Sequence, residues 1–252
     1  MRRVNHAPLG RCLYCLASGV PLTEEHLIPR VLGGRLTLRD AVCEPCRRLT
    51  GQPEQTTLDR EFLVPKTLLA LKRRRARGQG PSRLPAVLLA GEDAPSTLTA
   101  DIFPRGFALP VFGRAGLLEG FSGTGIPPRI DFIDCTLNLG TPRRHAIAAT
   151  APLIDPKAYA WSIAKWAYAL AVGERGLDGF DTQPMRDLMS GRRDDAFSFV
   201  GTASPRRWGS GEWLHEVSLH EDGPWLAVTL ALFASTGMAA YEVVVGRMLA
   251  NA

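Results

Sequence analysis

The first residues of the chain that could do chemistry are two Cys-x-x-Cys pairs, Cys12 with Cys15 and Cys43 with Cys46. Two such pairs supply four thiolates, the ligand set of a closed tetrahedral zinc site that stabilises a loop-rich segment. The alternative is two unrelated pairs of buried thiols, but two pairs with this spacing rarely arise by chance in a chain with five cysteines. The spacing therefore predicts one structural Zn²⁺ ion bound by all four, and it leaves Cys135 as a core thiol.

The segment between the cysteine pairs contains a second candidate site, in the run Thr23-Glu24-Glu25-His26-Leu27-Ile28-Pro29. A lone histidine is more often structural than catalytic. Here two carboxylates precede the imidazole, and this combination is typical of a general base that works beside a divalent metal ion. The run therefore predicts acid–base chemistry at His26.

The order of the motifs between Arg11 and Gly51 resembles the zinc-supported branch of the HNH endonucleases, also called His-Me finger or ββα-metal nucleases. The matching parts are the first Cys-x-x-Cys, then EHLIP, then LGG, then LRDAVCEPC. The resemblance implies a zinc-stabilised β-hairpin followed by a helix, with one Mg²⁺ or Mn²⁺ ion at their junction. It also implies metal-dependent hydrolysis of phosphodiester bonds in nucleic acid.

The same resemblance implies a role for each motif residue. His26 corresponds to the general base that activates water, and Glu25 to the acidic ligand of the catalytic ion. Asp40 stands where the family usually has the asparagine that orients the histidine, and the four cysteines hold the structural zinc ion. Later stretches such as DDAFSFVG and TGMAAYEVVVGR resemble bacterial proteins described only as HNH-like, which adds no substrate.

The residues after Cys46 depart from the family pattern. The family commonly places histidine or asparagine directly after the last cysteine to complete the catalytic metal site, whereas this chain has Arg47 and Arg48. An arginine side chain has no acceptor atom and cannot ligate a cation. The expected function is a metal-dependent endonuclease, which a third ligand from residues 49–54 would support. An arginine in the place of the ion would favour a catalytically inactive zinc-binding module that binds nucleic acid.

Basic side chains near these motifs are the candidate contacts to nucleic acid. The chain has a formal net charge of +5, and only four of its 30 basic residues are lysines. A GC-rich genome explains most of this bias, although arginine is also the better phosphate ligand. The run from Lys72 to Arg77 fits a solvated helix end equally well, and its place beside the cysteine motifs favours nucleic acid, most simply DNA. The expected phosphate contacts are Arg30, Arg47, Arg48, Lys72, Arg73, Arg74, Arg75 and Arg77.

The elements that must position these residues follow from periodicity and from turn residues, and they predict an α+β chain. We expect a zinc module over residues 1–58, a basic helical connector over 59–83, and an α+β domain over 84–252. A helix interrupted near Pro65 is expected over residues 56–77. Nothing in the sequence assigns a role to the third region, and control of the zinc module by a sensed ligand is a hypothesis based only on the size of that region.

The α+β region is expected to combine short strands with two helices. Asp155 followed by Pro156 predicts a helix start, and Gly173 its stop. Apolar runs and alternation predict strands at 86–90, 96–103, 107–113 and 129–134, a helix at 184–189, and an antiparallel sheet from 213–220, 225–234 and 241–249.

The longest apolar stretch, from Trp225 to Val245, is long enough to cross a bilayer. Ser235, Thr236 and Gly237 interrupt it, so two buried strands joined by a turn are expected instead. The N-terminus has two arginines but no continuous apolar run after them, which makes a poor secretory signal. We therefore expect a cytoplasmic protein with no membrane partner.

Overall fold

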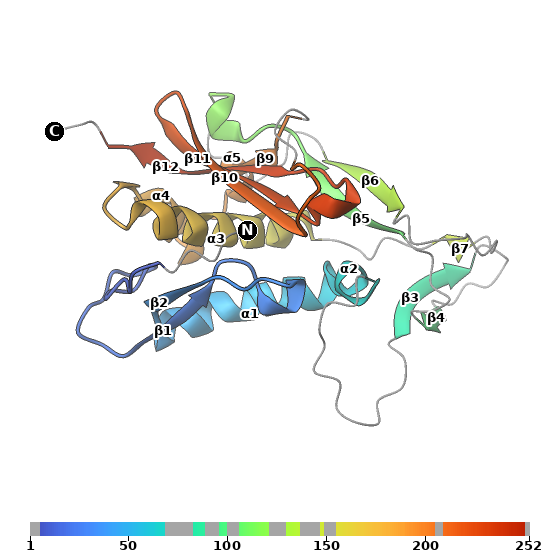
Figure 1. Cartoon of the computed structure of the whole chain (residues 1–252), viewed down its shortest axis with the longest axis horizontal. Helices are drawn as coiled ribbons and strands as arrows, with labels where there is room; N and C mark the ends of the chain where they lie inside the picture. The colour runs from blue at the N-terminus through green and yellow to red at the C-terminus, as the bar shows by residue number, and fades with distance from the viewer. Residues whose placement is uncertain are drawn as a thin grey trace.

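The computed structural model describes residues 6–68, 83–88, 96–99, 106–120, 130–136, 147–148, 155–204 and 209–249. The described residues form an α+β structure in which the long helix α3 (Pro156–Arg175) is the central element. One side of α3 faces a large antiparallel sheet, and the other side faces an N-terminal unit made of a hairpin and a helix (Figure 1).

The N-terminal unit begins with a loop that carries the first cysteine pair. An antiparallel hairpin follows, and a helix starts directly after Cys43 with Pro45 in its first turn, where the helix needs no amide donor. The expected helix start at Thr56 is therefore wrong, because the helix already begins at Glu44. The elements are β1 (Leu22–His26), η1 (Arg30–Leu32), β2 (Thr37–Cys43), α1 (Glu44–Arg60) and α2 (Leu63–Leu68).

The large sheet has the strand order β10-β11-β12-β8, and β9 pairs with β12 beside β8. The expected hairpin is confirmed: Asp222 pairs with Trp225, and the turn contains Gly223 with a φ of +57°. The apolar segment after Trp225 forms two strands around a short 3₁₀ turn, as expected. The elements are β8 (Phe180–Asp181), α4 (Gln183–Met189), α5 (Ala196–Phe199), β9 (Val200–Thr202), β10 (His215–Asp222), β11 (Trp225–Leu232), η4 (Ala234–Thr236) and β12 (Tyr241–Met248).

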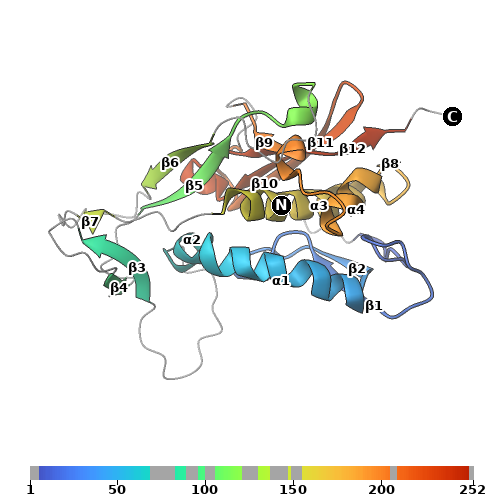
Figure 2. The ribbon, with the colours of Figure 1, turned by 180° about the vertical axis from the view of Figure 1, so that it is seen from behind.

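The strands of the middle region form two small antiparallel sheets, one of β5 with β6 and one of β4, β3 and β7. Each of the four predicted strands overlaps an observed strand, and residues 89–90, 100–103 and 129 of the predicted ranges lie outside the described residues. Seen from behind, β3, β4 and β7 lie beyond the end of α2 (Figure 2). Cys135 falls in β6, but its side-chain environment lies outside what the structure describes. The elements are β3 (Arg83–Leu88), β4 (Ser96–Thr99), β5 (Gly106–Phe112), η2 (Gly116–Leu118), β6 (Ile130–Thr136) and β7 (Ile147–Ala148).

Helix α3 starts as the sequence predicts. The Asp155 carboxylate accepts hydrogen bonds from the backbone amides of Lys157 and Ala158, each at 3.0 Å. The predicted stop at Gly173 is wrong. A Cβ atom there would lie 3.1 Å from side-chain atoms of both His6 and Leu38, so this glycine makes room for a neighbour and the helix continues to Arg175.

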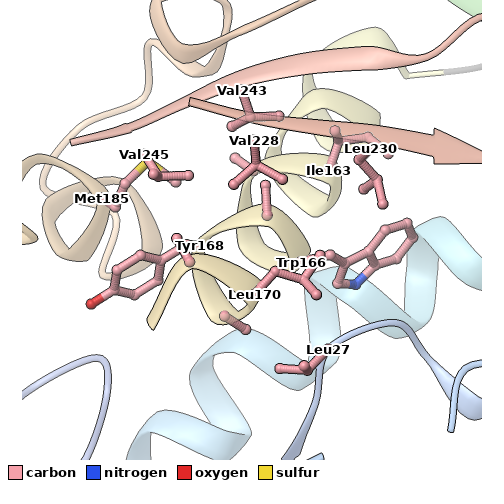
Figure 3. Packing of buried hydrophobic residues seen from close by; sticks show 14 of the residues in the cluster. Leu27, Ile163, Trp166, Tyr168, Leu170, Met185, Val228, Leu230, Val243 and Val245 are labelled. Carbon is pink, nitrogen blue, oxygen red and sulfur yellow. The ribbon is translucent and has the colours of Figure 1, made fainter. Parts of the chain in front are cut away.

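Helix α3 is buried around most of its circumference, which is typical of a helix packed between two layers. Figure 3 shows valine and leucine side chains of β11 and β12 reaching towards it from one side, and Leu27 of the N-terminal unit on the other. Most of the buried apolar side chains form one cluster that extends from Cys12 to Val245, and four alanines form a second, small one. The zinc module expected over residues 1–58 therefore shares its core with the rest of the chain.

Glu61, directly after α1, is a buried acid with an incomplete set of partners. One carboxylate oxygen accepts a hydrogen bond from the Asp155 amide at 3.2 Å, and the other has no partner among the described residues. Burial raises the pKa of Glu61 above its ordinary value. A raised folded-state pKa gives stability that is present below the unfolded pKa, about 4.3, and is lost as the pH rises.

Glu61→Gln is expected to become more stable relative to the wild type as the pH rises from about 4 to 8, because the amide cannot ionise. Urea unfolding of both proteins across that range measures the difference in free energy of unfolding. Glu212→Gln, at an exposed position, is the matched control. A difference that stays constant with pH for Glu61→Gln would contradict the prediction.

Within the described ranges, no helix is long and apolar enough to cross a membrane. The stretch from Trp225 to Val245, which has the length of a membrane span, forms β11, η4 and part of β12.

Candidate functional site

The two cysteine pairs converge at the start of the N-terminal hairpin. Cys12 and Cys15 lie in the loop before β1, Cys43 ends β2, and Cys46 lies in the first turn of α1. Their Sγ atoms all lie within 4.8 Å of one another, and Cys15 Sγ is 3.6 Å from Cys43 Sγ. Sulfurs bound tetrahedrally to zinc at about 2.3 Å are about 3.8 Å apart. The four predicted ligands are therefore brought together in a cluster that could hold zinc.

The chemistry of this cluster favours a bound cation. All four thiols are free of disulfides, and all but Cys15 are buried. Burial and the neighbouring Cys12 raise the pKa of Cys46 well above its ordinary value. Four thiolates cannot share this space without a compensating charge. A zinc ion would supply that charge and displace the thiol protons.

A bulge in β2 determines where Asp40 lies. The register between β1 and β2 shifts between Thr23 and Glu25. Asp40 has a φ of +48°, which aspartate tolerates better than most residues, and its carbonyl oxygen accepts a hydrogen bond from the Gly10 amide at 3.1 Å. Its exposed side chain forms no hydrogen bond with His26 in the described part of the chain. These contacts give Asp40 a role in joining β2 to the first cysteine loop.

The LGG motif closes the loop between β1 and β2. Gly33 caps η1 with a φ of +91°, a conformation that favours glycine. A Cβ atom on Gly34 would lie 1.9 Å from the carbonyl oxygen of Ile28, so no side chain fits there. The closed loop keeps Ile28 and Pro29 buried and carries Arg30 on its outer surface.

His26 lines a pocket of about 570 Å³ between the hairpin and α1. Its Nε2 atom is 3.9 Å from Glu24 Oε1, whereas its buried Nδ1 atom has no hydrogen-bond partner among the described residues. The imidazole can therefore reach solvent through the pocket, but it lacks the orienting partner that a general base usually has.

A buried cluster of charged groups forms the inner wall of this pocket. Lys165 Nζ lies 2.9 Å from Glu25 Oε1 and 2.7 Å from Glu54 Oε2. The Tyr14 hydroxyl donates to Glu25 at 3.0 Å, and Trp166 Nε1 donates to Glu54 at 2.6 Å. Burial alone would lower the pKa of Lys165, but the two carboxylates raise it above its ordinary value. The ammonium group, whose side chain is 3% exposed, therefore stays charged.

This cluster stands where the family resemblance places the catalytic Mg²⁺ or Mn²⁺ ion. Glu25 is the expected ligand and Glu54 lies in the expected 49–54 region, but both bind the Lys165 ammonium, which has no acceptor and cannot ligate a metal. Across the described ranges, the four-cysteine cluster is the only group of His, Cys, Asp and Glu side chains that could hold a metal. The residues fit zinc and do not fit a catalytic divalent ion.

Arg47 and Arg48 lie on the exposed face of α1 at the rim of the same pocket. Both donate to Glu44, Arg47 at 2.6 and 2.8 Å and Arg48 at 2.6 Å. These hydrogen bonds lower the pKa of Glu44 to about 2. Exposed ion pairs of this kind are weak, so both guanidinium groups can turn to another anion. Arg30 lies on the loop side of the pocket.

The structure brings together most of the predicted site and adds one residue that was not predicted. His26, Glu25, Arg30, Arg47 and Arg48 line one pocket. The unpredicted member is Lys165, whose signal was its place as the single charged residue among residues 158–173 of α3, because a buried lysine requires a partner. The expected phosphate contacts that lie outside the described residues are Lys72, Arg73, Arg74, Arg75 and Arg77.

Comparison of the chain with protein-family models, with curated proteins and with solved structures finds no match. The likeness to HNH endonucleases is therefore carried by the motif residues alone. What the site does has to be inferred from its geometry.

Proposed function

We propose that this chain is a zinc-supported nucleic-acid-binding protein, with an HNH-like finger formed by β1, β2 and α1. The observation that carries the proposal is the Lys165 ammonium between Glu25 and Glu54. It occupies the position of a catalytic ion, so the finger keeps the zinc ligands and the phosphate-facing arginines without a divalent ion for hydrolysis. A metal-dependent endonuclease would need that ion.

The charges around the pocket support phosphate binding at its rim. Lys165 offsets one of the two negative charges of Glu25 and Glu54, so these acids repel an incoming polyanion less, although Glu24 adds a negative charge to the pocket lining. Glu44 pairs with both Arg47 and Arg48, so one of these two positive charges is not compensated. Arg30 adds a further positive charge. Arginine binds phosphate through two parallel hydrogen bonds, which sets orientation as well as affinity.

Replacing Arg47 and Arg48 together by glutamine is expected to weaken DNA binding for every sequence. The slope of log K against log [salt] should become shallower by about 2, because two phosphate contacts and their released counterions are lost. Fluorescence anisotropy of a labelled DNA duplex between about 50 and 200 mM salt measures that slope. The matched control is Arg175→Gln with Arg192→Gln, two exposed, ion-paired arginines that do not line the pocket.

Two results would overturn this proposal. The first is the absence of binding to any DNA or RNA probe by the wild-type protein at low salt. The second is cleavage of nucleic acid with Mg²⁺ or Mn²⁺ that His26→Ala abolishes, which would restore the endonuclease hypothesis. Zinc must be retained in both assays, because the finger depends on it.

A further inference from the structure

A second pocket, of about 480 Å³, lies between the β1–β2 loop and the start of β10. Its lining is mainly apolar, and the polar groups at its floor are already used. His215 Nε2 donates to the Leu32 carbonyl oxygen at 2.6 Å, and His215 Nδ1 accepts from the Phe233 amide at 3.3 Å. A pocket of this size and polarity suits a flat organic ring.

Trp213 lines this pocket and is 55% exposed, more than any other large hydrophobic side chain in the described ranges. Its backbone is held on both sides. The Trp213 amide donates to Glu216 Oε1 at 3.3 Å, and the Trp213 carbonyl accepts from the Ser235 amide at 3.2 Å. The Glu216 carboxylate also accepts from the Ser210 amide and hydroxyl, at 2.6 and 3.0 Å. The indole is therefore presented by a braced loop, which lowers the entropy lost on binding.

The rim of the pocket carries positive charge. Arg35 is exposed and forms no ion pair with any residue that the structure describes. The residues that line the pocket include no acid. A ligand with an aromatic ring and a phosphate would match both the apolar interior and this guanidinium group.

The two pockets flank the same short stretch of chain. Leu27 and Ile28 line the Trp213 pocket, whereas His26, Pro29 and Arg30 line the pocket of the proposed phosphate site. These residues are consecutive in the chain, so a strand whose phosphates contact Arg30, Arg47 and Arg48 would have to cross this stretch to place a base beside Trp213.

We propose that the Trp213 pocket takes one unpaired base of a single-stranded nucleic acid, with a neighbouring phosphate on Arg35. This inference rests on the proposed function and adds a preference for exposed bases over a paired duplex. Stacking on an aromatic ring tolerates any base, because every base has a π-face. The site would therefore confer strand selectivity without sequence selectivity.

The test compares two probes of equal length and charge, a thymidine oligonucleotide and an abasic deoxyribose-phosphate chain. Wild type is expected to bind the first about 10- to 100-fold more tightly, and Trp213→Ala to lose most of that ratio. Trp213→Phe should retain much of it, because phenylalanine still stacks. Arg35→Gln should lower the affinity for both probes by the same factor. Leu249→Ala, which truncates a similarly exposed apolar side chain, is the matched control and should leave the affinity for both probes unchanged.

The possible outcomes distinguish the proposed base pocket from the proposed nucleic-acid binding on which it rests. If wild type binds both probes equally, or if Trp213→Ala keeps the full ratio, the base pocket is ruled out. Phosphate binding by Arg30, Arg47 and Arg48 would be unaffected by that result. If wild type binds neither probe nor a duplex, both proposals fall together. Circular dichroism and zinc content of every variant show whether a loss of binding follows from misfolding.

Discussion

Cys43→Ser is expected to release zinc and to lower the melting temperature of the whole protein by about 10 °C or more. The remaining thiols lose the ion that compensates their charge, and a serine hydroxyl is a poor substitute ligand. The effect should spread beyond the loop, because the N-terminal unit has no separate core. Leu13 is fully buried, and its carbonyl oxygen accepts a hydrogen bond from the Tyr168 hydroxyl of α3 at 2.8 Å.

Metal analysis and thermal unfolding of the same samples check this prediction. Wild type should contain one zinc ion per chain, and chelation should reproduce the effect of the substitution. Cys135→Ser removes the cysteine outside the cluster and should leave the zinc content unchanged. Full zinc occupancy in Cys43→Ser, or an unchanged melting temperature after complete removal of the metal, would show that the cluster is not a structural zinc site.

Lys165→Met is expected to lower the free energy of unfolding by about 3–5 kcal/mol, because it leaves two buried carboxylates without their counter-charge. Most of that loss comes from the unpaired acids. Neutralising them by adding Glu25→Gln and Glu54→Gln should therefore recover stability. Lys157→Met, at a half-exposed lysine of the same helix that pairs with Asp194, is the matched control and should cost less than about 1 kcal/mol. Equal losses for the two single variants, measured by denaturant unfolding, would contradict the prediction.

The same variant tests whether the ammonium stands in for a metal ion. With Lys165 replaced by methionine, Glu25 and Glu54 would face each other across a space without a cation. Mn²⁺ is then expected to raise the melting temperature of Lys165→Met and to leave that of wild type unchanged. A ligand at about 100 times its dissociation constant stabilises a protein by about 2.7 kcal/mol. Stabilisation of wild type by Mn²⁺ would instead show that the ion displaces the lysine.

Features set by neighbouring residues were predictable from the sequence. The cysteine pairs indicated a four-thiol cluster because their spacing is itself the signal. Asp155 marked the start of α3 because a cap needs only the next few amides. The turn at Gly223 followed from alternation before it and an apolar run after it.

Features that depend on distant contacts were not predictable. Gly173 read as a helix stop because glycine often is one, and only the packing of His6 and Leu38 against it shows why it lies inside the helix. The environment of Glu25 was missed for the same reason. Its partner Lys165 comes from α3, the helix that also bonds Glu54 through Trp166 across 112 residues of sequence.

The long reach of α3 also determines the order in which this protein can be completed as it is synthesised. All four cysteines have been translated by residue 46, so the zinc cluster can close early. The Tyr168–Leu13 bond spans 155 residues, and Lys165 is translated nearly as late. Until α3 is translated, Glu25 and Glu54 lack their buried partner and the inner face of the hairpin is uncovered. During that interval a bound metal would be the main restraint on the nascent N-terminal unit, so a cell short of zinc would expose an unfinished hairpin until α3 has been translated.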